Sequence, residues 1–132
     1  MPVRILNQAQ VTELLPMDEC VAVMEGVLRT LAAGGAQLPL RTVLRLPEAD
    51  GIFGVMPAQL SSPAALGLKA IAAFPRNEGT RLDSHQGVVL LLHPETGAPI
   101  AVMDASSITA IRTAAVSGVA TRALARPEAS DL

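Results

Sequence analysis

The only lysine of the chain is the residue whose type and position most clearly indicate chemistry. Lys69 is accompanied by nine arginines and stands in an apolar run over residues 66–74, which predicts a strand. Two interpretations fit a lysine in such a strand. Its stem can pack against apolar neighbours while the amine reaches water, or a partly buried ammonium can bind a substrate carboxylate or polarise a reacting carbon centre.

Three arginines can supply further positive charge. Arg41 and Arg45 share one face of a strand predicted over residues 40–46, where they form either a cationic wall or the charged guard of a solvated edge strand. Arg112 falls in the apolar arc of a helix predicted near the C-terminus, and an arginine there is costly unless it meets an anion. That anion can be a carboxylate of the protein or of a ligand.

A polar stretch between two apolar segments holds Ser84 and His85. A serine next to a histidine does not indicate a nucleophile and its base, because such pairs are defined by spatial geometry. His85 and His93 lack metal-ligand spacing, so we expect no metal site. The ten glycines form neither a Gly-x-Gly-x-x-Gly run nor a P-loop, so we expect no nucleotide-binding motif in this chain.

The composition excludes several classes of protein. The chain has 132 residues, of which 50% are hydrophobic, and this fits one domain over residues 1–132. We expect no binding of nucleic acid, because the net charge is −2 and the chain has two Phe and no Trp or Tyr. It therefore offers neither a basic surface nor aromatic side chains on which bases could stack. No apolar stretch reaches the roughly 18 residues of a membrane span, and the first residues show no signal-peptide pattern, so we expect neither element. Cys20 is the only cysteine, so it cannot form an internal disulfide. Together these observations lead us to expect a soluble, cytoplasmic protein.

The elements that must position these residues can be predicted from periodicity and turn signals. Residues 4–6 suggest a short strand, and Asn7 with Gln10 fits a capping box for a helix that ends near Leu15. A second helix should begin near Pro16 and end at two consecutive glycines, because its apolar side chains recur at helical spacing.

Five strands joined by short turns should follow, and a last helix should end the chain. Ser106 or Ser107 can cap this helix, which carries a stripe of hydroxyl side chains suited to tight packing. Strands connected by hairpins predict an α+β domain with an antiparallel sheet and flanking helices. The predicted strands are 40–46, 52–59, 66–74, 88–92 and 100–103, and the stripe is Thr109, Thr113, Ser117 and Thr121.

Seven short motifs are spaced along the chain between residues 39 and 115. They are Pro39-Leu40-Arg41, Gly54-Val55-Met56-Pro57-Ala58, Leu66-Gly67-Leu68-Lys69, Ser84-His85-Gln86-Gly87, Pro94-Glu95-Thr96-Gly97, Ala101-Val102-Met103-Asp104 and Ile108-Thr109-Ala110-Ile111-Arg112-Thr113-Ala114-Ala115. In this order and spacing they resemble the N-terminal part of the ornithine cyclodeaminase/mu-crystallin family.

The resemblance implies an NAD(P)-dependent enzyme, a lyase or oxidoreductase such as ornithine cyclodeaminase, alanine dehydrogenase or ketimine reductase. In this family an N-terminal domain binds a small amino or imino acid and forms a homodimer, and a Rossmann domain binds NAD or NADP. The chain ends before that Rossmann domain, so we expect a truncated protein, inactive alone and without tight cofactor binding. Its partner can be the missing Rossmann half. The alternative is a non-catalytic dimeric module that binds a small carboxylate.

The resemblance also implies substrate-binding roles for four residues. Arg41 matches the arginine of the Pro-x-Arg pattern that binds the substrate carboxylate. Lys69 matches the lysine that faces the substrate, and we assign it the catalytic role. Arg112 matches an arginine near both the carboxylate and the cofactor, and Met56 matches a position that lines the pocket.

The cofactor-binding residues implied by the resemblance are Ser84, His85 and Arg112. Many relatives carry threonine at the position of Ser84, so the hydroxyl is kept. Arg45 is left out, because the Pro-x-Arg register points to the earlier arginine. Gly54 stands where an acidic side chain could project toward a distal amine, which favours an apolar or small substrate over ornithine.

Overall fold

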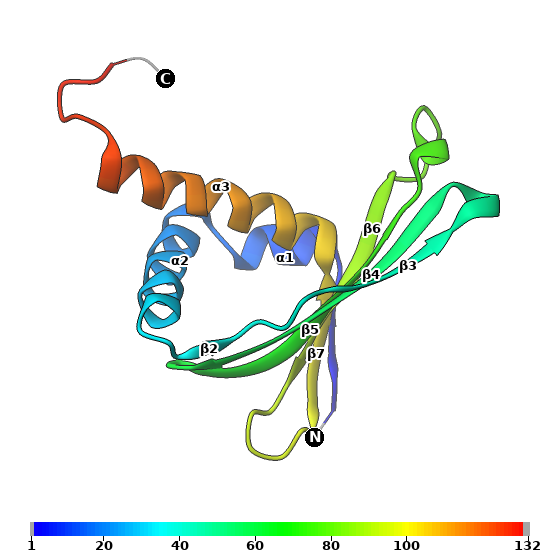
Figure 1. Ribbon diagram of the computed structural model, residues 1–132, viewed down its shortest axis with the longest axis horizontal. Helices are drawn as coiled ribbons and strands as arrows, with labels where there is room; N and C mark the ends of the chain where they lie inside the picture. The colour runs from blue at the N-terminus through cyan, green and yellow to red at the C-terminus, as the bar shows by residue number, and fades with distance from the viewer. Residues whose placement is uncertain (1, 131–132) are drawn as a thin grey trace.

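The structure is a computed structural model that describes residues 2–130. Over these residues, three helices gather on one side of a strongly twisted sheet (Figure 1). The helices are α1 (Gln8–Leu14), α2 (Met17–Ala32) and α3 (Ala105–Leu124). The strands are β1 (Arg4–Leu6), β2 (Ala36–Gln37), β3 (Thr42–Leu46), β4 (Gly51–Ser61), β5 (Ala64–Ala73), β6 (His85–Leu92) and β7 (Pro99–Asp104).

The sheet is mostly antiparallel, as predicted, with one parallel pair. Its strands follow the order β1-β7-β6-β5-β4-β2, and β3 also pairs with β4. Strands β4 to β7 form a meander of hairpins, which confirms the α+β prediction. Strand β1 instead runs parallel to β7, with Arg4 beside Ala101. This pairing joins segments almost a hundred residues apart, so no local turn signal could predict it.

The first helix begins as the sequence predicts. The backbone N–H of Gln10 donates to Asn7 Oδ1 at 3.0 Å, and the Asn7 N–H donates to Gln10 Oε1 at 3.0 Å. This reciprocal pair is the expected capping box. Helix α2 follows Pro16, and the chain leaves it at Gly34, whose φ of 79° is a conformation that glycine adopts without strain.

The cap of α3 differs from the prediction. Asp104, the last residue of β7, caps the helix in place of Ser106 or Ser107. Its Oδ1 accepts hydrogen bonds from the Ser107 N–H at 2.8 Å and from Ser107 Oγ at 2.7 Å. An aspartate is a strong N-cap, so the chain passes from the strand into the helix without a loop.

The small core lies between α2 and α3. Cys20 and Val21 of α2 pack against Ala115 of α3, and all three side chains are buried. A Cβ atom added to Gly118 would lie 3.4 Å from Val21 Cγ2, so the two helices approach closely there. Burial raises the pKa of the Cys20 thiol.

Two expectations for α3 are wrong. Arg112 is exposed, so it is not a buried charge within the apolar arc that packs on α2. Thr113 and Ser117 are also exposed, and their hydroxyls donate to backbone carbonyls one turn earlier. Such bonds satisfy a hydroxyl on a solvated helix face, whereas Thr109 is partly buried.

The two faces of the sheet differ in what covers them. Lys69 lies on the face toward the helices, in a cross-strand row with Met56 and Val89. The alternate side chains form the open face, where an apolar row crosses five strands: Pro57, Leu68, Leu90, Val102 and Ile5. No helix within residues 2–130 is long and apolar enough to cross a membrane.

Candidate functional site

Lys69 is held between the sheet and the last helix. It lies in the middle of β5, where strand alternation directs its side chain toward the helix side. The side chain is partly buried, and its Nζ donates to Thr109 Oγ1 on α3 at 3.3 Å. Of the two interpretations of this residue, the geometry favours a partly buried ammonium over one that extends into water.

Two arginines from other elements act on the same ammonium. Burial lowers the pKa of Lys69 most, and the positive charges of Arg112 and then Arg41 lower it further. Arg112 lies one turn after Thr109 on α3, and Arg41 directly precedes β3. Both arginines therefore lie close enough to affect the ammonium, and we call Arg41, Lys69 and Arg112 the cation cluster.

The strand register explains why Arg41 and not Arg45 joins the cation cluster. Thr42 pairs with Val55, so the preceding position lies level with Met56 and therefore with Lys69. Arg45 pairs with Ile52, four residues further along, which is a displacement of about 13 Å. Arg45 is exposed and is not among the groups that shift Lys69.

No acidic side chain neutralises the cation cluster among residues 2–130. The two ion pairs of this part of the chain join Arg29 to Glu25 and Arg126 to Glu128, away from Lys69. Like charges without a counter-ion favour the binding of an anion. A guanidinium can hold a carboxylate through two parallel hydrogen bonds, and an ammonium adds a point charge.

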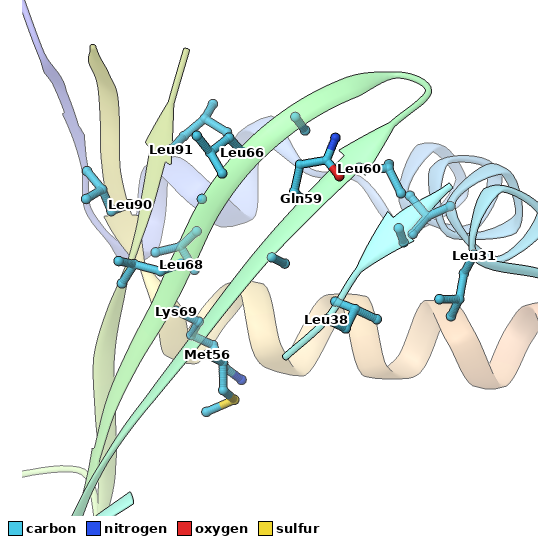
Figure 2. A pocket seen from close by; sticks show the side chains of 16 residues that line it. Leu31, Leu38, Met56, Gln59, Leu60, Leu66, Leu68, Lys69, Leu90 and Leu91 are labelled. Atoms are coloured by element: carbon cyan, nitrogen blue, oxygen red, sulfur yellow. The ribbon is translucent and has the colours of Figure 1, made fainter. Parts of the chain in front are cut away.

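Met56 stands opposite Lys69 at one end of an apolar pocket (Figure 2). The pocket has a volume of about 320 Å³ and lies between the sheet and the last turns of α2. Leu31 of α2 and Leu38, which follows β2, line its outer side. Met56 thus lines a pocket, and this pocket adjoins the cation cluster.

Ser84 and His85 lie at the start of β6, away from the cation cluster. The Ser84 carbonyl accepts from the Phe74 N–H at 2.7 Å, and the His85 carbonyl accepts from Ser106 Oγ at 2.9 Å. His85 shares the face of Lys69 but lies four residues along the strand, about 13 Å away. Their backbone contacts fix the start of β6 to β5 and α3, and their cofactor-binding role stays a prediction.

Thr109 is the site residue that the sequence did not single out. It belonged to the hydroxyl stripe of the last helix, which was interpreted as a packing surface. The available signal was its spacing: Thr109 and Arg112 are three residues apart, which places them on one helix face. No group of three or more potential metal ligands gathers anywhere in residues 2–130.

Comparison with known proteins gives this arrangement its context. The sequence profile of the ornithine cyclodeaminase/mu-crystallin family matches residues 2–132. The chain belongs to this family. An alanine dehydrogenase of Archaeoglobus fulgidus is 39% identical over 126 residues, which are 96% of this chain and 38% of that protein.

Two solved structures of the family share the fold. The Δ(1)-pyrroline-2-carboxylate reductase of Thermococcus litoralis, in complex with NADH and L-proline, has a TM-score of 0.88 and 37% identity over 94% of this chain. An archaeal alanine dehydrogenase dimer with bound NAD has a TM-score of 0.90 and 38% identity over 98% of this chain. The chain spans only 38% and 39% of those proteins, respectively.

Proposed function

We propose that this chain provides the substrate-binding part of an NAD(P)-dependent amino- or imino-acid oxidoreductase or cyclodeaminase. The observation that carries the proposal is the cation cluster, in which Lys69, Arg41 and Arg112 interact without an acidic partner. Family members include an alanine dehydrogenase and an imino-acid reductase, both of which act on small carboxylates.

The proposed roles follow from the chemistry of each side chain. Arg41 and Arg112 bind the substrate carboxylate, since a guanidinium is always charged and can bind in a bidentate manner. Lys69 faces the reacting carbon, where its charge stabilises electron density that develops during the reaction. Thr109 positions the ammonium by accepting its hydrogen bond at 3.3 Å.

We propose that residues 2–130 do not hold a dinucleotide by themselves. They contain no Gly-x-Gly-x-x-Gly turn between a strand and a helix, and this turn is what holds a pyrophosphate in Rossmann domains. Ser84, His85 and Arg112 are proposed to contact the cofactor only when another domain holds it. We therefore propose that tight NAD(P) binding and turnover require a Rossmann unit in addition to these residues.

We further propose that a second copy of the chain covers the open face. Four large apolar residues whose register places them on this face are exposed by 40–78%: Ile5, Leu44, Phe53 and Val88. The chain has an accessible surface of 9355 Å², whereas a compact monomer of its mass would expose about 6,600 Å². The excess of about 2,800 Å² matches the area that one chain buries in a large obligate dimer interface.

A charged substitution on the open face tests the dimer. Val88 lies on that face in the middle of β6 and is 43% exposed, so a glutamate there can be solvated in a monomer but not at an apolar interface. Light scattering should give a dimer mass for the wild type and a monomer mass for Val88→Glu. Leu124→Glu, at a residue 83% exposed on α3, is the control and should stay dimeric. A monomeric wild type would overturn the dimer proposal.

Carboxylate binding tests the proposed function. The probe is pyrrole-2-carboxylate, a stable planar analogue of a cyclic imino acid, and pyrrole-2-carboxamide is its uncharged match. In a titration followed by amide NMR shifts, we expect the carboxylate to bind at least about tenfold more tightly, since it alone neutralises the cation cluster. Arg41→Met should reduce this preference, because Arg41 is assigned to the carboxylate, whereas Arg45→Met should keep it. Equal binding of the two probes by the wild type would refute the proposal.

A further inference from the structure

The apolar pocket beside Lys69 has a defined direction. It spans residues 56–60 of β4 and 65–69 of β5, so Met56 and Lys69 stand at one of its ends (Figure 2). In the middle of the pocket, Ala58 pairs with Gly67 on its floor. Two such small residues side by side leave space that longer side chains would fill.

The lining of the pocket is apolar with one charged end. Its residues are aliphatic or small apart from Gln59 and Lys69, and none is acidic. Gln59 alternates with Ala58 and Leu60 along β4, so strand geometry directs its side chain to the opposite face. The pocket can therefore accept hydrocarbon, while a second ammonium would be buried there without a partner.

The other side of Lys69 offers no acidic group either. Gly54 lies on the same face of β4, two residues before Met56. It is buried and pairs with Ile71 of β5. A Cβ atom built on Gly54 would already lie 3.5 Å from Ile71 Cγ1, in ordinary contact. Neither the apolar pocket on one side of Lys69 nor Gly54 on the other side provides a carboxylate that can pair with the distal amine of a diamino acid.

We propose that this pocket receives the substrate side chain, and that the substrate is a carboxylate with an apolar side chain larger than a methyl group. The inference rests on the proposed function, because the cation cluster fixes the carboxylate at the Lys69 end. The volume of about 320 Å³ lies at the lower end of the range for small-molecule pockets. Leu31 and Leu38 close the outer side over the bound chain.

Three carboxylates that differ only in their chains test the inference in the wild-type protein. They are acetate, 4-methylpentanoate and 5-aminopentanoate, titrated separately and followed by amide NMR shifts. We expect 4-methylpentanoate to bind about tenfold more tightly than acetate, since burying about two of its four added carbons gives this factor. We expect 5-aminopentanoate to bind at least about tenfold more weakly than 4-methylpentanoate, because its ammonium has no partner.

A substitution in the floor of the pocket tests the inference independently, through the ratio of two affinities. Ala58→Leu fills the pocket, so the ratio of the 4-methylpentanoate affinity to the acetate affinity should fall toward one. Ala120→Leu makes the same change at an exposed position of α3 and should keep the wild-type ratio. In the wild type, 4-methylpentanoate should also shift the amides of residues 56, 58–60 and 65–67, which acetate should affect less.

The outcomes separate this inference from the proposed function. Equal affinity for all three carboxylates, or equal affinity for 4-methylpentanoate and 5-aminopentanoate, would overturn the apolar side-chain pocket and leave carboxylate binding intact. Shifts confined to the surroundings of Lys69 would overturn it in the same way. If no carboxylate binds, the cation cluster is not a substrate site, and the proposed function fails together with the inference.

Discussion

Replacing Lys69 with methionine should stabilise the free protein, because the surroundings of this lysine oppose its charge. Burial lowers the pKa of Lys69 most, and the guanidinium groups of Arg112 and Arg41 lower it further. Methionine is a flexible, unbranched side chain without charge, so it can follow the path of the lysine stem. The Lys69→Met variant therefore removes the desolvation cost and two repulsions from the native state.

The magnitude follows from the contacts of this one ammonium. Each interaction between partly exposed charges contributes about 0.2–1 kcal/mol. The hydrogen bond to Thr109 is long at 3.3 Å and contributes about 0.5 kcal/mol in the opposite direction. Two repulsions and the desolvation cost outweigh this bond. We expect the free energy of unfolding at neutral pH to rise by about 1 kcal/mol.

The gain should depend on pH in one direction. A base whose pKa is lower in the native state than in the unfolded state makes the protein more stable as pH rises between the two values. For Lys69 this interval ends near the ordinary value of 10.5. The advantage of Lys69→Met is therefore complete at neutral pH and disappears as the pH approaches that value.

Urea unfolding followed by far-UV circular dichroism measures this difference, since the chain has no Trp or Tyr for fluorescence. Arg45→Met is the matched control, because Arg45 is exposed on β3 and does not act on Lys69. We expect the control to change the free energy of unfolding by less than about 0.5 kcal/mol. A loss of stability in Lys69→Met, or a gain that is the same at every pH, would contradict the reasoning.

Three further predictions concern the fold and the activity. Asp104→Ala removes the acceptor of two hydrogen bonds at the start of α3 and should cost about 1 kcal/mol in urea unfolding, whereas an unchanged midpoint would contradict this cap. Gly67→Ala should destabilise by about 1–3 kcal/mol, because the new Cβ would lie 2.5 Å from the Leu90 carbonyl oxygen; Gly26→Ala, with nothing within 4 Å in α2, should instead stabilise by about 0.5–1 kcal/mol. The purified chain should not oxidise NADH in the presence of an imino acid, and measurable turnover would refute its dependence on a Rossmann unit.

Local signals in the sequence predicted the elements whose contacts are local. The capping box at Asn7, the helix after Pro16 and the hairpins β4–β5 and β6–β7 each depend on residues a few positions apart. The parallel pairing of β1 with β7 depends on residues almost a hundred positions apart, and no turn chemistry encodes it. The cap at Asp104 was missed because this residue also ends a strand, and the serines that follow it are equally good caps in isolation.

The sequence predicted the candidate site only in part. The family resemblance singled out Lys69 and Met56, but only pairing between strands could show that they stand opposite each other. The choice of Arg41 over Arg45 came from the family resemblance, and the register of β3 on β4 supplies its physical reason. The exposure of Arg112 depends on which face of α3 packs on α2, and small residues such as alanine allow several faces to pack.

The titration of the Lys69 side chain itself tests the cation cluster most directly. Because the chain has a single lysine, labelling lysine with carbon-13 at Cε gives one side-chain NMR signal that needs no assignment. We expect the pKa of free Lys69 to lie below the ordinary value of a lysine, and to rise when pyrrole-2-carboxylate binds, since the anion stabilises the charged form. An ordinary pKa that the carboxylate leaves unchanged would contradict a carboxylate-binding cluster at Lys69.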